Sequence, residues 1–319
     1  SPVSDVAIAL SAPASSTPGQ TITVSAGALA ANQLTVDESF VISGGSLALG
    51  GNSAINGTFA MSGGTLGGTG SLALNGAASW SGGTVSLAGL NVLATGTLAI
   101  SGSGVTKTIG TGGILNNAGT VNWTAGNLSI GGTFNNQSGG VVNALVANGL
   151  DDMTGVGTFN NLAGSVYNNN AASGNSSVGV AAFNNAGAFK MVSGVTDYFN
   201  TVFTNTGNID IASGATLKTN PGFTATFNVN AGTSLTGAGQ WQINNNDTVN
   251  INTPVSTPAG MSISQTGGSV NLASNLTTLG SYSLSGGTIT GSGTISANGS
   301  NANNSVTNDA SGGGGAGGS

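Results

Sequence analysis

The sequence predicts an all-β protein, a parallel β-solenoid with coils of about 19–25 residues, and three observations support this. Glycine supplies 57 of the 319 residues, whereas charged residues make up only 4%. Short runs of Val, Ile, Leu and Phe alternate with small or polar residues, which is typical of strands. Turn-forming motifs recur about every 20 residues, as the coils of a solenoid require.

Residues 1–33 lack the repeat and contain three prolines, at positions 2, 13 and 18. Strand-like runs occur at 6–10 and 21–24. One interpretation is an amino-terminal cap over the first coil, which solenoids need to stay soluble. The other is a set of strands that pair with a neighbouring subunit. The second interpretation makes the following apolar residues the subunit contacts: Val6, Ile8, Leu10, Ile22 and Val24.

Residues 34–300 are expected to form the coils, and Ser-Gly-Gly is their first repeated motif. It occurs at 43–45, 62–64 and 81–83, a spacing of 19 residues each time, and a late copy stands at 285–287. Each copy is followed by Thr or Ser and then by alternating small and apolar residues. Glycine adopts the positive φ angles of tight corners, so we expect these motifs where the coil turns.

A second repeat, built on paired asparagines, fills the middle of the chain. An apolar residue and two asparagines occur at 115–117, 134–136, 159–161 and 183–185, with a degenerate copy at 203–205. Asparagine tolerates left-handed corners, and stacked copies can hydrogen-bond as ladders. Residues 301–319, rich in Gly, Ser and Asn, are expected to form a flexible tail.

The composition excludes several classes of function. The chain has no cysteine, histidine or arginine and only three lysines, so disulfides and Cys/His metal sites are absent. Neutralising a nucleic-acid backbone needs more cations than this, so we expect no nucleic-acid partner. No apolar run reaches the roughly 18 residues of a membrane helix, so we expect no transmembrane segment. Most proton-shuttling and oxyanion-binding groups are also missing, which argues against an enzyme.

The acidic residues offer the remaining candidates for a metal site. Asp151 and Asp152 are adjacent, and Asp247 follows three asparagines. Their oxygens are ligands that calcium prefers, so calcium is the one cofactor considered, although solvated loop acids are the commoner explanation. Neighbours on a strand point to opposite faces, so Asp151 and Asp152 would share one site only in a loop.

Aromatic side chains are the candidates for contacts with sugars. If exposed, they could stack on glycan rings, but in a solenoid they more often fill the core, and the sequence leaves both interpretations open. The residues concerned are Trp80, Trp123, Trp241, Tyr167, Tyr198 and Tyr282.

Residues 114–123, 80–84 and 285–295 resemble the β-strand repeats of large bacterial surface proteins. Filamentous-haemagglutinin-like adhesins and autotransporter passengers share this style of repeat over a region matching about 34–300. The resemblance implies an exported, right-handed parallel β-helix that acts as a stalk, an adhesin or a fibre.

The sequence therefore favours a non-enzymatic structural protein, secreted or on a cell surface, that assembles with copies of itself into a fibre or surface layer. A monomeric adhesin stalk that binds host or matrix glycans is the alternative. A polysaccharide-degrading β-helix enzyme is a third hypothesis, which would depend on Asp151 or Asp152.

Overall fold

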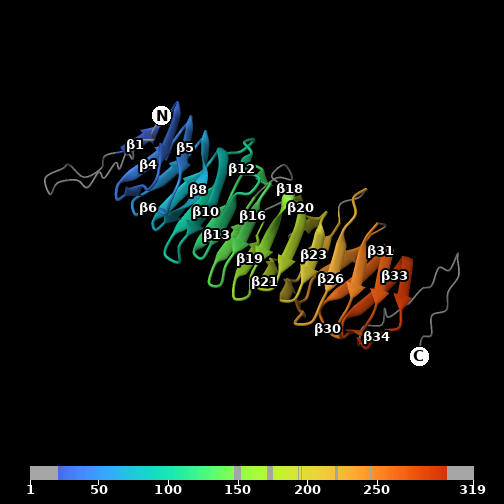
Figure 1. The fold of residues 1–319 in the computed structure, drawn as a ribbon. Helices are drawn as coiled ribbons and strands as arrows, with labels where there is room; N and C mark the ends of the chain where they lie inside the picture. The colour runs from blue at the N-terminus through green and yellow to red at the C-terminus, as the bar shows by residue number, and fades with distance from the viewer. Residues whose placement is uncertain are drawn as a thin grey trace.

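The structure, a computed structural model, describes residues 21–146, 152–170, 175–192, 194, 196–219, 222–244 and 246–299. These residues contain strands and no helix, and all strand pairs are parallel. The chain winds into a β-solenoid of about 12 turns, so the predicted fold class is confirmed. Figure 1 shows the resulting rod, with the first strands at one end and the last strands at the other.

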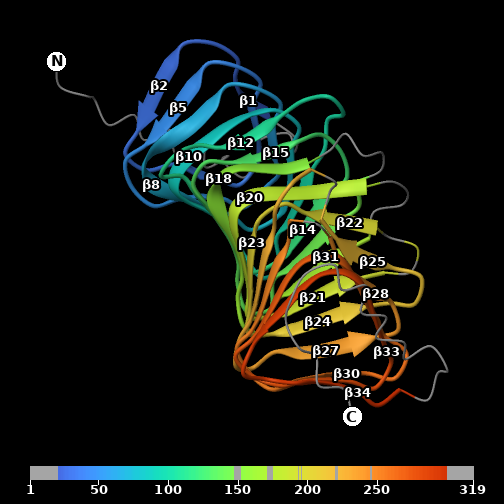
Figure 2. The same ribbon diagram turned by 90° about the vertical axis from the view of Figure 1, so that its right-hand side faces the viewer.

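Each coil contributes strands to three columns, which we call faces 1, 2 and 3 in the order in which the chain visits them. In the view of Figure 2 the strands of face 1 from β14 to β34 lie one above another. The strands of face 1 are β1 (Thr21–Val24), β4 (Ser39–Ile42), β7 (Phe59–Met61), β9 (Ala77–Trp80), β11 (Thr97–Ile100), β14 (Thr120–Trp123), β17 (Val141–Ala144), β19 (Val166–Asn169), β21 (Ala188–Met191), β24 (Asn208–Ile211), β27 (Ser234–Gly237), β30 (Val255–Thr257), β32 (Leu276–Thr278) and β34 (Ile295–Ala297).

Faces 2 and 3 share six long strands that bend from one face to the next, and their other strands are shorter. Face 2 also contains β2 (Ala28–Ala31), β5 (Ser46–Leu49), β12 (Lys107–Ile109), β15 (Leu128–Ile130), β22 (Thr196–Phe199), β25 (Thr216–Lys218) and β28 (Gln240–Ile243). Face 3 also contains β3 (Thr35–Val36), β6 (Ser53–Ile55), β13 (Ile114–Asn117), β16 (Thr133–Asn136), β23 (Val202–Asn205), β26 (Thr226–Val229) and β29 (Thr248–Ile251). The shared strands are β8 (Thr65–Leu74), β10 (Gly83–Val92), β18 (Asp152–Asn161), β20 (Asn175–Asn185), β31 (Ser262–Leu272) and β33 (Ser281–Gly291).

The register between coils matches the predicted spacing. Thr21 pairs with Ser39, which gives the shortest coil of 18 residues, and Asn208 pairs with Ser234, which gives the longest of 26. Neighbouring parallel strands lie about 4.8 Å apart, so each coil lengthens the rod by that amount. The pairs β1–β4 and β2–β5 belong to this stack, so residues 21–33 already contribute strands to the solenoid. Residues 1–20 and 300–319 lie outside the described residues.

The core is a set of apolar columns because side chains alternate between inside and outside along each strand. Face 3 contributes the longest aromatic column, in which neighbouring ring centroids lie 4.7–5.7 Å apart. Such pairs add about 0.5–1.5 kcal/mol each beyond the burial of their area. The column consists of Phe134, Phe159, Phe183, Phe203 and Phe227.

Ser-Gly-Gly motifs form corners, as predicted, and the glycines are needed there. Gly64 has a φ of +75°, and a Cβ on it would lie 2.6 Å from the carbonyl oxygen of Gly45 in the preceding coil. The first three motifs join face 1 to face 2, but the late copy at 285–287 joins face 2 to face 3. The late copy is therefore not another member of the same corner column.

Candidate functional site

The predicted carboxylate candidates do not come together. Asp152 begins β18 on face 2, whereas Asp247 lies in the corner after β28. Four coil steps separate β18 from β28, or roughly 19 Å along the rod. Asp151 lies outside the described residues. Within the described part of the chain, no three residues of the His, Cys, Asp or Glu types cluster as a metal site would require.

Asp247 is buried at its corner, with 2% of its surface exposed. One carboxylate oxygen, Oδ2, accepts a hydrogen bond of 2.8 Å from the backbone N–H of Asn244. Burial raises the pKa of this carboxyl above its ordinary value, and the nearby Thr219 hydroxyl and the N–H groups of Asn244 and Ala225 oppose part of that rise. Calcium binding by Asp247 stays a prediction. In the described corner, Asp247 would be its one carboxylate ligand.

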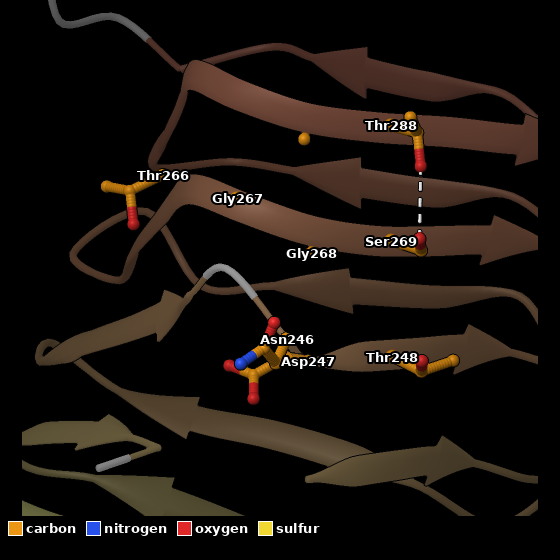
Figure 3. A pocket seen from close by; sticks show the side chains of 9 residues that line it. Asn246, Asp247, Thr248, Thr266, Gly267, Gly268, Ser269 and Thr288 are labelled. Atoms are coloured by element: carbon orange, nitrogen blue, oxygen red, sulfur yellow. Dashed lines mark hydrogen bonds between the residues drawn. The ribbon is translucent and has the colours of Figure 1, made fainter. Parts of the chain in front are cut away.

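A pocket of about 420 Å³ adjoins Asp247 at the corner between faces 2 and 3. Figure 3 shows Thr248, Ser269 and Thr288 in a row on successive strands, while the Asp247 side chain lies apart from that row. The hydroxyls of Ser269 and Thr288 share a hydrogen bond of 3.0 Å. The remaining lining is Asn246, Thr266 and three corner glycines, so hydroxyls, one amide and one carboxyl are the chemistry that the pocket offers.

The paired asparagines form two ladders on face 3, one inside the rod and one outside. In the inner ladder the Nδ2 of each of the first four asparagines donates to the Oδ1 of the next coil at 2.6–2.8 Å and to a carbonyl of face 1. The last amide donates to the hydroxyl of Thr233 instead. These side chains are at most 1% exposed. The predicted ladder is thus present, and its inner members are Asn117, Asn136, Asn161, Asn185 and Asn205.

The outer ladder carries the first asparagine of each pair. Its amides are half-buried and hydrogen-bond along the rod at 2.8–2.9 Å, from Asn91 to Asn184. A second run from Asn228 through Asn250 and Asn271 ends at the hydroxyl of Thr290. The exterior of face 3 therefore carries an uncharged stripe of amides and hydroxyls.

The aromatic candidates for sugar contacts are buried. Five of the six are at most 2% exposed, and Tyr198 is 8% exposed with the ammonium of Lys218 4.9 Å above its ring. The indole N–H groups of Trp80 and Trp123 donate to the carbonyls of Gly82 and Gly126 inside the corners. The sequence left open whether these rings face sugars or fill the core, and in the structure they fill the core.

Lys107 is a buried residue that the sequence reasoning missed. Its side chain is fully buried on the inner side of β12, where Leu128 occupies the same position one coil later. The ammonium donates to the main-chain carbonyls of Gly102, Val105 and Ala125 at 2.7–3.2 Å. The sequence does contain a signal for this position. Side chains alternate along a strand, so Lys107 points to the same side as the apolar Ile109, which is the inner side.

The two ends of the rod are a further candidate site, for contact with another chain. Leu29 on β2 stands in the column of Leu47 and Leu66, which are buried, but is itself 49% exposed. Ile289 on β33 stands in the column of buried Val270 and is 40% exposed. Within the described residues no further strand pairs with the outer edges of β1, β2 and β3, or of β33 and β34.

Val6, Ile8 and Leu10, the first three predicted subunit contacts, lie outside the described residues. Ile22 and Val24 lie on the edge strand β1, where Val24 is buried and Ile22 packs partly buried against the core. The edge position of β1 leaves both the cap and the subunit contact open as interpretations.

Comparisons with protein-family models, with curated proteins and with solved structures found no match for this chain. Across the part of the chain that the structure describes, no helix has the length and apolar character to cross a membrane.

Proposed function

We propose that this chain is a non-enzymatic, extracellular structural protein whose β-solenoid rod assembles with copies of itself into a fibre or surface layer. The observation that supports this proposal is the exposure of strand edges and core residues at the two ends of the rod. Within the described residues, each terminal coil has unpaired strand edges and an exposed apolar core residue, Leu29 or Ile289. Unpaired edges are templates for pairing with another chain.

The sides of the rod support the same proposal. They carry few charges, and their outer asparagines bond to one another along face 3. A thiol-free chain with three lysines and no arginine also suits an oxidising, protease-rich exterior. Among the described aromatic side chains only Phe223 is largely exposed, and a single ring offers little stacking surface for glycans, so the fibre is favoured over the glycan-binding stalk.

The test is electron microscopy of the purified chain at neutral pH, together with its size-exclusion profile. We expect regular fibres or sheets and a concentration-dependent shift to high mass. Isolated rods of a single length at all concentrations would contradict self-assembly and favour the stalk.

A further inference from the structure

The second and the last of the described coils follow one sequence pattern. Residues 39–57 read SFVISGGSLALGGNSAING and residues 281–299 read SYSLSGGTITGSGTISANG. Both contain an alternating strand, a Ser-Gly-Gly corner, two further strands and a final Asn-Gly. β1 and β2 start seven residues apart, and so do the segments of β33 that begin at Ser281 and Thr288. The third strands differ by one residue, because the inward residue Val36 of β3 corresponds to Ala297 of β34.

The two coils are nevertheless out of phase by one face. The strand before Ser43-Gly44-Gly45 is β4 on face 1, whereas the strand before Ser285-Gly286-Gly287 is the first half of β33 on face 2. The chain therefore begins its pattern on face 1 and ends it on face 2.

The order of the exposed edges requires the same offset in a stack of two rods. The last three strand segments lie on faces 2, 3 and 1, and the first three strands lie on faces 1, 2 and 3. A continued solenoid would place its next strand over the first half of β33 on face 2, the one after it over the second half on face 3, and the third over β34 on face 1. If β1 lay over β34, so that face 1 stacked on face 1, β2 and β3 would follow one coil later. The positions directly above the two halves of β33 would then stay empty. If β1 lies over the first half of β33, no gap remains.

We propose that copies of this chain stack head to tail with a rotation of one face at each junction, an inference that rests on the proposed function. β1 pairs with the first half of β33, β2 with its second half, and β3 with β34, all in parallel. The corner at 25–27 then stacks on the corner at 285–287, where Gly27 and Gly287 both have positive φ angles.

The side chains at this junction are compatible. Leu29 covers Ile289, so the exposed core residue of each end meets an apolar partner, and Ile22 lies over Tyr282, which is already buried in the last coil. Thr23 and Ala30 lie above Ser283 and Thr290 on the outer side. The described strands at both ends are uncharged, so stacking opposes no like charges.

The first experiment blocks one end at a time. Leu29→Lys blocks the amino-terminal end and Ile289→Lys blocks the carboxy-terminal end, and both residues are exposed enough to accept lysine. Val202→Lys is the matched control, because Val202 is 43% exposed on the side of the rod at β23. We expect each end variant alone to lose polymers in size-exclusion chromatography, and the control to keep them.

An equimolar mixture of the two end variants tests polarity. Each supplies the end that the other lacks, so we expect dimers and no longer species. Dimers formed by Ile289→Lys alone would indicate contact between two amino-terminal ends and overturn the proposal. If the unaltered chain polymerises and both end variants still do, self-assembly stands but this junction is wrong. If the unaltered chain stays monomeric, the proposed function and the junction both fail.

Cysteine pairs test the rotation, because the chain has no cysteine of its own. Leu29→Cys with Ile289→Cys places two thiols on neighbouring strands within disulfide range only if the junction is rotated. Ile22→Cys with Ile295→Cys does so only if face 1 stacks on face 1. We expect the first variant alone to give a ladder of cross-linked multimers on a non-reducing gel, and a ladder from the second alone overturns the rotation.

Deletion of residues 1–18 separates this junction from linkage by the amino-terminal strands. Polymers that persist after the deletion support stacking of β1–β3 on β33 and β34. Loss of polymers would overturn direct stacking and assign the link to residues 1–18.

Discussion

Each asparagine pair on face 3 puts two identical side chains into opposite environments. Asn161 is buried, donates to Asn185 and to the carbonyl of Ala188, and accepts from Asn136 and Ser165. On the half-solvated exterior, Asn160 bonds to both neighbouring coils in the opposite direction, because it donates to Asn135 and accepts from Asn184. The pairs and their ladders were predictable from the sequence. The inward position of Lys107 was not inferred, because a lysine enters a core only where local carbonyls surround its ammonium.

We expect Asn161→Ala to destabilise the rod by about 2–5 kcal/mol, because it leaves several buried polar groups without partners. Asn160→Ala, its neighbour on the same strand, should cost less than about 1 kcal/mol, since water replaces its contacts. Urea unfolding followed by circular dichroism gives both values. Equal losses for the two variants would contradict the separation of inner and outer ladders.

The buried carboxyl of Asp247 makes stability depend on pH. Its folded-state pKa is raised above 3.8, so its contribution to stability is present below the unfolded pKa and is lost as pH rises through the folded pKa. We therefore expect Asp247→Asn to raise the unfolding midpoint at pH 7 and to change it little near pH 3. Asp210→Asn, on the outer side of β24, is the control. A gain at pH 3 that exceeds the gain at pH 7 would contradict this sign.

At the scale of the element, the corner and not the strand determines where the coil turns. The strands accept many residue types at outward positions, from Ala60 to Lys190. Corners with a positive φ and a neighbouring carbonyl accept glycine alone, which explains why the early Ser-Gly-Gly motifs predicted coil length. The position of the Ser-Gly-Gly motif at 285–287 between faces 2 and 3 was not predictable. The spacing of motifs gives the number of residues per coil but not the face on which each strand lies.

We expect Gly64→Ala to destabilise the fold by more than about 1 kcal/mol, because its Cβ would meet a main-chain oxygen at a positive φ. Gly67→Ala in the following strand should be nearly neutral, since the nearest atoms to its Cβ lie 3.9 Å away. Thermal unfolding of both variants checks this. A larger loss for Gly67→Ala would argue against the corner as the constraint.

At the scale of the whole molecule, the contacts of the described strands are mainly between neighbouring coils, and nothing in these strands sets the number of coils. Stability in such a stack is close to a sum of coil and interface terms. A second copy that stacked on an end of the rod would form one more interface of parallel strand pairs, like those between the coils within one chain. The solenoid and its coil length were predictable from sequence periodicity, whereas the exposed edges needed the assignment of strands to faces.

The shift of the Ser-Gly-Gly corner from one edge of the rod to the next also bears on the chain's ancestry. Duplication of whole coils copies a corner onto the same edge every time. The motifs at 43–45, 62–64 and 81–83 share one edge, and the motif at 285–287 lies on another. A change of edge requires an insertion or deletion that is not a whole coil. An internal alignment that assumes one continuous repeat would therefore pair strands from different faces.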